Sequence, residues 1–455
     1  MMAAAAAARA GAAVTIYEHR SEAGRKLLMT GNGKCNLTNL RMGISYYYCD
    51  SECGQRVVSS VLSEFDGEDT LSFFHGIGLL TYDRDGYVYP QSDQAVTVRD
   101  VLVRECAYQG VTFCYDVDVY PLLRQEKENG RFMIGEARFD SVILACGGKS
   151  ERQTGSDGSG YEIAKRFGHR ISTPLPALVP LYTDEAGWQS MAGVRVKAGV
   201  RLLVDGIEAG EAQGELQLTA QGISGIPVFE LSRIAVHAIY GGKSVEAEIC
   251  FLNGREREQV EALIRRMLAR GRKEKEHTGM LCETGGVFCA SDEQEKNGRR
   301  NMSVQQLLTG IVNEKILSFL VSRNGWKTVE GLHKINISDE KLAKAMTQQL
   351  FSLRISISGH GKLEHAQVTS GGVLFEEVTE HLESRLCKGL FFAGEMLDVD
   401  GICGGYNLQW AWSSGAVAGI GAAGNVRGGN VHGGDVRGGD VCEGNVCDGN
   451  VHGGD

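Results

Sequence analysis

The chain has 455 residues, of which 42% are hydrophobic and 23% charged, a balance that is typical of globular proteins and excludes a fibre or a disordered chain. Its net charge of -10 repels polyanions, so bulk electrostatics do not favour nucleic acid as a partner. Its 61 glycines are about twice the usual share, which indicates either turns packed against a ligand or a biased segment.

The first predicted elements are a helix and a strand. Residues 1–10 are almost all alanine, a strong helix former, and Gly11 ends this segment. Residues 13–17 predict a short buried strand that ends at Glu18, so that helix, turn and strand resemble the second half of a βαβ unit. The apolar strand and G-x-G-x-x-G loop of the first half are absent. The pattern predicts either an N-terminally truncated sequence or the loss of the phosphate loop.

The character of the sequence changes twice after this unit. An α/β pattern is followed, from residue 175 to about 251, by short strands with glycine turns that indicate a β domain. Strand patterns of the first kind return after residue 366. We therefore predict one α/β domain interrupted by a long insertion. The expected helices are 93–108, 256–272 and 303–323, and the expected strands are 111–115, 117–123, 131–134, 139–145, 367–369 and 390–393.

The last stretch of the chain has a different composition. Residues 424–455 repeat G-[ND]-V-x-x six times and hold eleven of the glycines. A unit this short and polar cannot bury a core, so we expect a disordered tail.

The segment that follows Glu18 is the first candidate site. Residues 24–39 read GRKLLMTGNGKCNLTN, with three glycines and the adjacent cations Arg25 and Lys26. An acid at the end of a second strand can accept both hydroxyls of an adenosine ribose, and such a loop can turn amides and cations toward a pyrophosphate. The alternative is a surface turn.

A second candidate site lies near the C-terminal end. A buried strand runs into Gly394–Glu395, and a Gly404–Gly405 turn then opens an apolar helix. This pattern places backbone amides and a helix dipole at one point, which suits a flavin with an acid on its ribityl chain. A third segment, Cys146–Gly147–Gly148, lets the backbone pass close to a cofactor. For the second segment the alternative is a glycine-rich loop leading into a core helix.

These segments carry a resemblance to a known family. With GYVYPQSDQA, PALVPL, LTAQGISGIPV, VTSGGV and GGYNLQWAWSSG, they make residues 1–421 similar to the bacterial BaiN/YhiN-type FAD-dependent oxidoreductases, which include bile-acid 4,6-reductase-like and aminoacetone-oxidase-like flavoproteins. The resemblance implies a discontinuous Rossmann-like FAD-binding domain of the α/β class, with an inserted β-barrel-like and helical domain. It predicts an FAD-binding domain at 1–174 and 366–421, the insertion at 175–365 and the repeat tail at 422–455.

The resemblance also implies the function. The family implies that FAD would receive a hydride at N5 from NAD(P)H and pass it to an activated C=C or C=N bond of a small molecule, or to oxygen. The sequence assigns no catalytic residue. The residues expected to bind FAD are Glu18, Arg25, Lys26, Gly31, Asn32, Gly33, Cys35, Asn36, Val117, Gly147, Gly148, Gly394, Glu395, Asp400, Gly404, Gly405, Tyr406, Asn407 and Leu408.

Two other functions are compatible with the same residues. The chain could be a degenerate, non-catalytic binding module that has lost its phosphate loop, or a flavin-dependent thiol–disulfide reductase that uses Cys35. Cys49 with Cys53, and Cys282 with Cys289, lack a matching second pair, so we expect no metal site.

The cysteines and apolar runs predict the compartment. Thirteen cysteines, an odd number, indicate reduced thiols rather than a disulfide framework. The longest purely apolar run, residues 1–8, is too short to cross a bilayer and lacks the basic residues of a signal peptide. We expect a cytoplasmic protein without membrane or nucleic-acid partners, and the oligomeric state is open.

Overall fold

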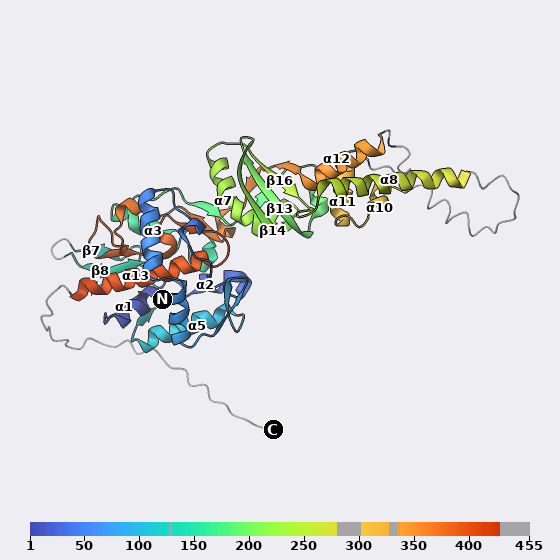
Figure 1. The fold of residues 1–455 in the computed structure, drawn as a ribbon. Coiled ribbons are helices and arrows are strands. Elements are labelled where there is room, and N and C mark those ends of the chain that lie inside the picture. Colours follow the sequence, from blue (N-terminus) through green and yellow to red (C-terminus); the bar gives the residue numbers. More distant parts are fainter. Residues whose placement is uncertain (127–129, 280–301, 327–334, 336, 428–455) are drawn as a thin grey trace, which may run out of the picture.

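The structure, a computed structural model, describes residues 1–126, 130–279, 302–326, 335 and 337–427 (Figure 1). Two bodies are visible in it, an α/β body that contains both ends of the described chain and a second body built around one large sheet. Within the described residues no helix is both long and apolar enough to cross a membrane. Most of the predicted repeat tail lies outside the described residues.

The α/β body contains two parallel strand pairs. β1 (Thr15–Tyr17) pairs with β6 (Thr112–Cys114), and β10 (Val142–Leu144) pairs with β20 (Leu390–Phe392). The second pair has Leu144 opposite Phe392, which is 248 residues further along the chain. Smaller antiparallel pairs join β2 (Thr38–Asn39) to β5 (Tyr87–Pro90) and β3 (Tyr47–Tyr48) to β21 (Asp400–Gly401). The remaining strands of this body are β4 (Thr81–Arg84), β7 (Leu123–Gln125), β8 (Phe132–Ile134) and β9 (Ala137–Phe139).

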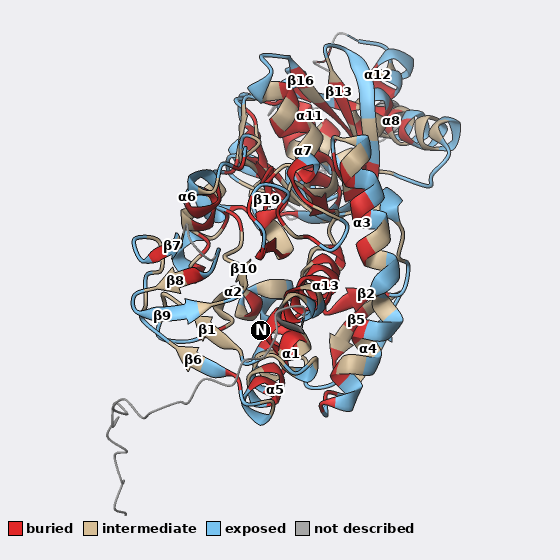
Figure 2. Cartoon of the chain, turned by 90° about the vertical axis from the view of Figure 1, so that its left-hand side faces the viewer, coloured by how far each residue is buried: buried red, intermediate tan, exposed pale blue. Residues whose placement is uncertain are grey.

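Helix α13 (Tyr406–Arg427) is the central helix of the α/β body, and Figure 2 shows that most of it is buried. The alanine-rich helix α1 (Met2–Arg9) packs closely against it. A Cβ atom at Gly419 would lie 2.3 Å from the Ala3 carbonyl oxygen, so only glycine permits this approach. The other helices here are α2 (Arg25–Leu28), α3 (Glu52–Glu64), α4 (Gly67–Gly76), α5 (Ala95–Tyr108) and α6 (Ser159–Arg166).

The second body is a seven-stranded sheet in the order β17-β16-β13-β14-β15-β12-β18, with all neighbours antiparallel. Helix α7 (Ile226–Tyr240) packs against it, and α8 (Arg257–Gly279), α10 (Val304–Leu307), α11 (Glu314–Arg323) and α12 (Asp339–Phe351) lie toward the far end in Figure 1. The strands are β12 (Leu181–Tyr182), β13 (Arg195–Val204), β14 (Ile207–Leu218), β15 (Gly222–Gly225), β16 (Val245–Cys250), β17 (Leu353–Ser356) and β18 (Gly359–His360).

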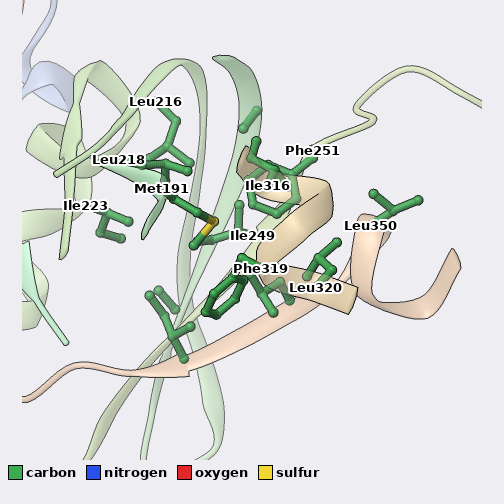
Figure 3. Packing of buried hydrophobic residues seen from close by; sticks show 14 of the residues in the cluster. Met191, Leu216, Leu218, Ile223, Ile249, Phe251, Ile316, Phe319, Leu320 and Leu350 are labelled. Atoms are coloured by element: carbon green, nitrogen blue, oxygen red, sulfur yellow. The ribbon is translucent and has the colours of Figure 1, made fainter. Parts of the chain in front are cut away.

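The apolar core of this second body lies between the sheet and the helices. Figure 3 shows Met191, Leu216 and Ile249 on the sheet side facing Phe319 and Leu320 of α11. All five side chains are buried. Each Å² of apolar surface removed from water stabilises the fold by about 25 cal/mol. This buried core therefore joins the sheet and the helices into one stable unit.

The chain passes between the two bodies twice, at neighbouring places. β11 (Leu175–Ala177) leads out of the α/β body and pairs antiparallel with β19 (Val368–Ser370), which leads back into it. The insertion is therefore connected to the α/β body by two adjacent strands.

Four predictions were wrong in their limits. Residues 139–145 are not one strand, because β9 ends at Phe139 and β10 begins at Val142. Residues 303–323 form two helices, α10 and α11, because Gly310 has a φ of +99° and Asn313 caps the second helix by accepting a hydrogen bond from the Lys315 amide. Residues 117–122 are not a strand, and β7 begins at Leu123. The first residues assigned to the tail, 422–427, belong to α13, since alanines continue the buried helix face.

We expect Leu216→Ala to lower the free energy of unfolding by about 2–5 kcal/mol, because it leaves a cavity in a fully buried part of the second body. Chemical denaturation followed by circular dichroism measures this change. Ile207→Ala, on the same strand β14 but with 74% of the residue exposed, is the matched control and should change stability little. Equal losses for the two variants would contradict this assignment of the core.

Candidate functional site

A carboxylate, Glu395, is the point where three predicted segments meet. It follows β20 in a short 3-10 turn, Gly394–Met396. Lys26 of α2 reaches it with an Nζ–Oε2 distance of 2.6 Å and donates to Ser150 Oγ at 2.6 Å. Ser150 Oγ donates to Glu395 Oε1 at 2.9 Å, and the Thr369 amide donates to the same oxygen at 2.6 Å. The sequence therefore predicted two members of this group, Lys26 and Glu395.

Gly148 allows the third segment to reach this group. A Cβ atom at this position would lie 2.4 Å from Thr369 Oγ1 and 3.1 Å from Glu395 Cδ. Thr369 Oγ1 accepts hydrogen bonds from the amides of Lys149 and Ser150, at 2.8 and 3.0 Å. Close backbone approach, which was the reason to expect a site here, is thus observed, although what the glycine approaches first is the strand β19.

The turn that opens α13 is held by the segment 36–39. Gly404 and Gly405 have φ values of +124° and +95°, and a Cβ at Gly405 would lie 2.7 Å from the Thr38 carbonyl. Asn39 Nδ2 donates to the Gly404 carbonyl at 2.9 Å. With its amide in the orientation that satisfies its neighbours, Asn36 accepts a hydrogen bond from the Gly405 amide at 3.2 Å. The predicted residues Asn36, Gly404 and Gly405 are therefore in contact.

The first turn of α13 is fixed from a second direction. Asn407 Oδ1 accepts from the Gly401 amide at 2.8 Å, and its Nδ2 donates to the Gly401 carbonyl at 2.7 Å. Tyr47 Oη donates to the Tyr406 carbonyl at 3.0 Å. The first amides of a helix have no partner within the helix and carry partial positive charge, so this rigid turn presents a site for an electron-rich group.

The predicted adenosine part of the site lies elsewhere in the α/β body. Glu18 follows β1, its Oε1 accepts from the Arg20 amide at 2.9 Å, and its carbonyl accepts from the predicted residue Val117 at 3.1 Å. Arg20 Nε is buried, and no hydrogen-bond partner for it exists within the described residues. Gly147, with a φ of +75°, lies beside Ser156.

The glycine-rich loop at 30–35 adopts left-handed backbone conformations. Gly31, Asn32 and Gly33 have φ values of +56°, +54° and +83°, and all three residues are exposed. No described contact joins them, or Arg25, to Glu395. Arg25 Nε instead lies 3.9 Å from Glu22 Oε1. Leu408 is partly buried in the cluster of Leu37 and Trp412.

Cys35 does not have the properties of a redox-active thiol. Its side chain is fully buried, and burial raises its pKa to about 12. The thiolate is the reactive form of cysteine, so a thiol that stays protonated and inaccessible does not attack a disulfide. Cys403, beside the α13 turn, likewise has its pKa raised to about 11 by burial.

Asp400 has a different partner from the one we predicted. Its side chain is 3% exposed, and Oδ1 lies 3.0 Å from Nε of Arg233, a residue of α7 in the insertion. The carboxylate is therefore occupied by an arginine of the second body. Sequence reasoning missed Arg233, because nothing distinguishes it within an amphipathic helix. It also missed Ser150, two residues after Gly148, and Thr369, which lies within the motif VTSGGV.

A cavity of about 580 Å³ is lined by Lys149 and Tyr161 but not by Glu395, Lys26 or Ser150 themselves. Tyr161 lines it and donates through Oη to the Glu395 carbonyl at 3.2 Å, and Lys149 lines it directly after Gly148. The volume is in the range of small-molecule sites. No group of three or more histidine, cysteine or acidic residues able to hold a metal occurs in the described part of the chain, and Cys282 and Cys289 lie outside it.

The residues present fit the ribityl and ring portion of FAD. The side chains of Glu395 and Lys26 are 17% and 28% exposed, so a ligand can reach both from solvent. A carboxylate suits the ribityl hydroxyls, an ammonium suits a phosphate or ring oxygen, and the start of α13 suits the electron-rich edge of the ring. The unpartnered Arg20 Nε offers a further donor on the Glu18 side.

Comparison with known proteins gives the following similarities. Residues 1–421 match the family described as HI0933-like protein Rossmann domain. The 3-dehydro-bile acid delta(4,6)-reductase of Clostridium scindens is 38% identical over 93% of this chain and 96% of its own length. A ribosomal RNA dihydrouridine synthase of Escherichia coli K12 is 26% identical over 91% of this chain and 93% of its own length. A solved flavocytochrome c3 fumarate reductase is 15% identical, with a TM-score of 0.44, over 93% of this chain and 76% of that one.

We expect Glu395→Gln to weaken FAD binding by at least about ten-fold, because a neutral amide loses the charge-assisted bonds to Lys26 and to the ligand. Titration of flavin fluorescence measures the affinity. Lys34→Met is the control, since Lys34 lies in the same segment as Lys26 but its Nζ pairs with Asp93 Oδ2 at 2.9 Å instead of Glu395. Unchanged affinity in Glu395→Gln would remove Glu395 from the site.

We also expect a pH dependence that Asp400→Asn abolishes. Burial, offset in part by Arg233, raises the pKa of Asp400 from 3.8 to about 6. Because the folded state holds this proton more tightly than the unfolded state, the contribution of Asp400 to stability is complete below pH 3.8 and is lost as the pH rises to about 6. The difference in unfolding free energy between the wild type and Asp400→Asn should therefore fall over this interval in denaturation experiments. A difference that is constant with pH would contradict the assignment.

Proposed function

The chain belongs to the HI0933-like Rossmann-domain family, and on this premise we propose that it is an FAD-dependent reductase that saturates an activated carbon–carbon double bond of a small molecule. Its class, an FAD-dependent oxidoreductase, follows from the family and from the reductase to which it is 38% identical. The observation that carries the finer proposal is the 38% identity to a protein named as a delta(4,6)-reductase over 93% of this chain. The family match over residues 1–421 spans the Glu395 group.

Within this reaction the described residues bind and orient. Bound FAD supplies the hydride chemistry. Glu395, Lys26 and Ser150 would hold the ribityl chain, since they are the accessible polar group at the junction of three segments. The turn Gly404–Gly405 and the first amides of α13 would face the ring, where their partial positive charge stabilises electron density.

We take NAD(P)H as the electron donor and a polycyclic 3-oxo compound with a conjugated double bond as the substrate. The second choice is supported by the name of the Clostridium scindens relative. The dihydrouridine synthase, at 26% identity, is named for the reduction of a base in RNA. The net charge of -10 disfavours a polyanion as the substrate of this chain.

The two other functions derived from the sequence are weaker. A thiol–disulfide reductase would need an accessible Cys35, and this side chain is fully buried. A binding module without activity is disfavoured because a protein named as a reductase is 38% identical over 93% of this chain.

The proposal predicts that the FAD-loaded protein loses its visible flavin absorbance when NADPH or NADH is added without oxygen. Addition of a 3-oxo-4-ene steroid or a dehydro bile acid should then restore the absorbance and give the saturated product, measured by mass spectrometry. The matched control is Lys34→Met, which should behave as the wild type. Uridine-containing RNA is tested in parallel. Flavin that neither nucleotide reduces would refute the donor, and reoxidation by RNA alone would refute the substrate class.

A further inference from the structure

The insertion and the α/β body are joined by a buried arginine. Arg233 of α7 lies with Nε 3.0 Å from Asp400 Oδ1 and with Nη2 3.1 Å from Asp50 Oδ1. Its guanidinium carbon is 4.6 Å above the ring centre of Tyr48. Only 11% of the arginine side chain is exposed. One planar cation from the insertion thus contacts three residues of the α/β body.

The three partners of Arg233 lie on one small piece of structure. Tyr48 is in β3 and Asp400 is in β21, and these two residues are directly opposite each other in the β3–β21 pair. Asp50 follows β3 by two residues. The arginine therefore fixes this strand pair from one side through both of its strands.

The same strand pair holds the start of α13. Gly401, next to Asp400, exchanges two hydrogen bonds with the side chain of Asn407, and Tyr47, next to Tyr48, donates to the Tyr406 carbonyl. An unbroken series of contacts therefore leads from α7 through Arg233 and the β3–β21 pair to the first turn of α13.

Other groups around the arginine do not replace it. His237, one turn later on α7, contacts Ser370 Oγ at 3.0 Å, and burial together with Arg233 lowers its pKa, so it is neutral near pH 7. Asp398 lies near the same cluster and adds negative charge. Among the described contacts, Arg233 therefore supplies the positive charge that faces the buried Asp400 and the neighbouring Asp50.

We propose that Arg233 is a positioning residue. It couples the first turn of α13, and with it the amides that would face the flavin, to the position of the insertion. The proposal rests on FAD binding at that turn for its consequence in catalysis, but the contacts that carry it are all within the protein. On this proposal the insertion contributes the residue that sets the geometry of the cofactor turn.

The test is hydrogen–deuterium exchange on the full chain without ligand, so its result does not depend on the proposed substrate or donor. Arg233→Met should accelerate exchange of the amides at 400–409 by about ten-fold or more, with little change in the sheet of the insertion. Arg233→Lys should give an intermediate effect, since one ammonium keeps the charge but cannot span Asp400 and Asp50. Arg195→Ala, at an exposed ion pair with Glu215 in the same sheet, is the control and should leave 400–409 unchanged.

A second measurement uses the FAD-loaded protein. The visible circular dichroism of bound flavin should change in Arg233→Met and be restored in part by Arg233→Lys, whereas Arg195→Ala should match the wild type. Wild-type exchange at 400–409 in a folded Arg233→Met variant would overturn the proposal. If Arg233→Met does not fold, the comparison is made with Arg233→Lys, where faster exchange limited to 400–409 supports the proposal and wild-type or uniformly faster exchange overturns it.

Discussion

The site depends on one charged contact between parts of the chain that are far apart in sequence. Lys26 and Glu395 are separated by 369 residues, yet their charged atoms lie 2.6 Å apart, and Ser150 is hydrogen-bonded to both. Neither group is removed completely from water, so the contact stays accessible to a ligand. Partly exposed ion pairs contribute little to stability by themselves. We therefore attribute this group to the organisation of a site rather than to the stability of the fold.

The sequence predicted those features of the fold and site that rest on local patterns. The alanine helix, the strand before Glu18 and the glycine turn before α13 follow from propensity and from backbone freedom, and the structure contains all three. The family resemblance was confirmed over residues 1–421. The FAD contacts of individual residues stay predictions, since most of them depend on a ligand.

What could not be predicted depends on contacts between distant segments. Asp400 looked like a cofactor ligand because it stands near Gly404, but its neighbour in space is Arg233, 167 residues away. Cys35 stood among polar loop residues, and only packing shows that its side chain points into the core of Leu37 and Leu102. The break between α10 and α11 needed the actual φ of Gly310, because the apolar spacing continues across it.

The nesting of the insertion inside the α/β body has a consequence for biosynthesis. The insertion is continuous in the chain between β11 and β19, so all of its strands leave the ribosome before β20 and α13 are made. It can fold while the first part of the α/β body still lacks the strand that pairs with β10 and the helix that packs on α1. If the insertion folds first, Arg233 stands on a folded surface when its partner Asp400 emerges, and the Gly404–Gly405 turn is then assembled last, against a template that the insertion provides.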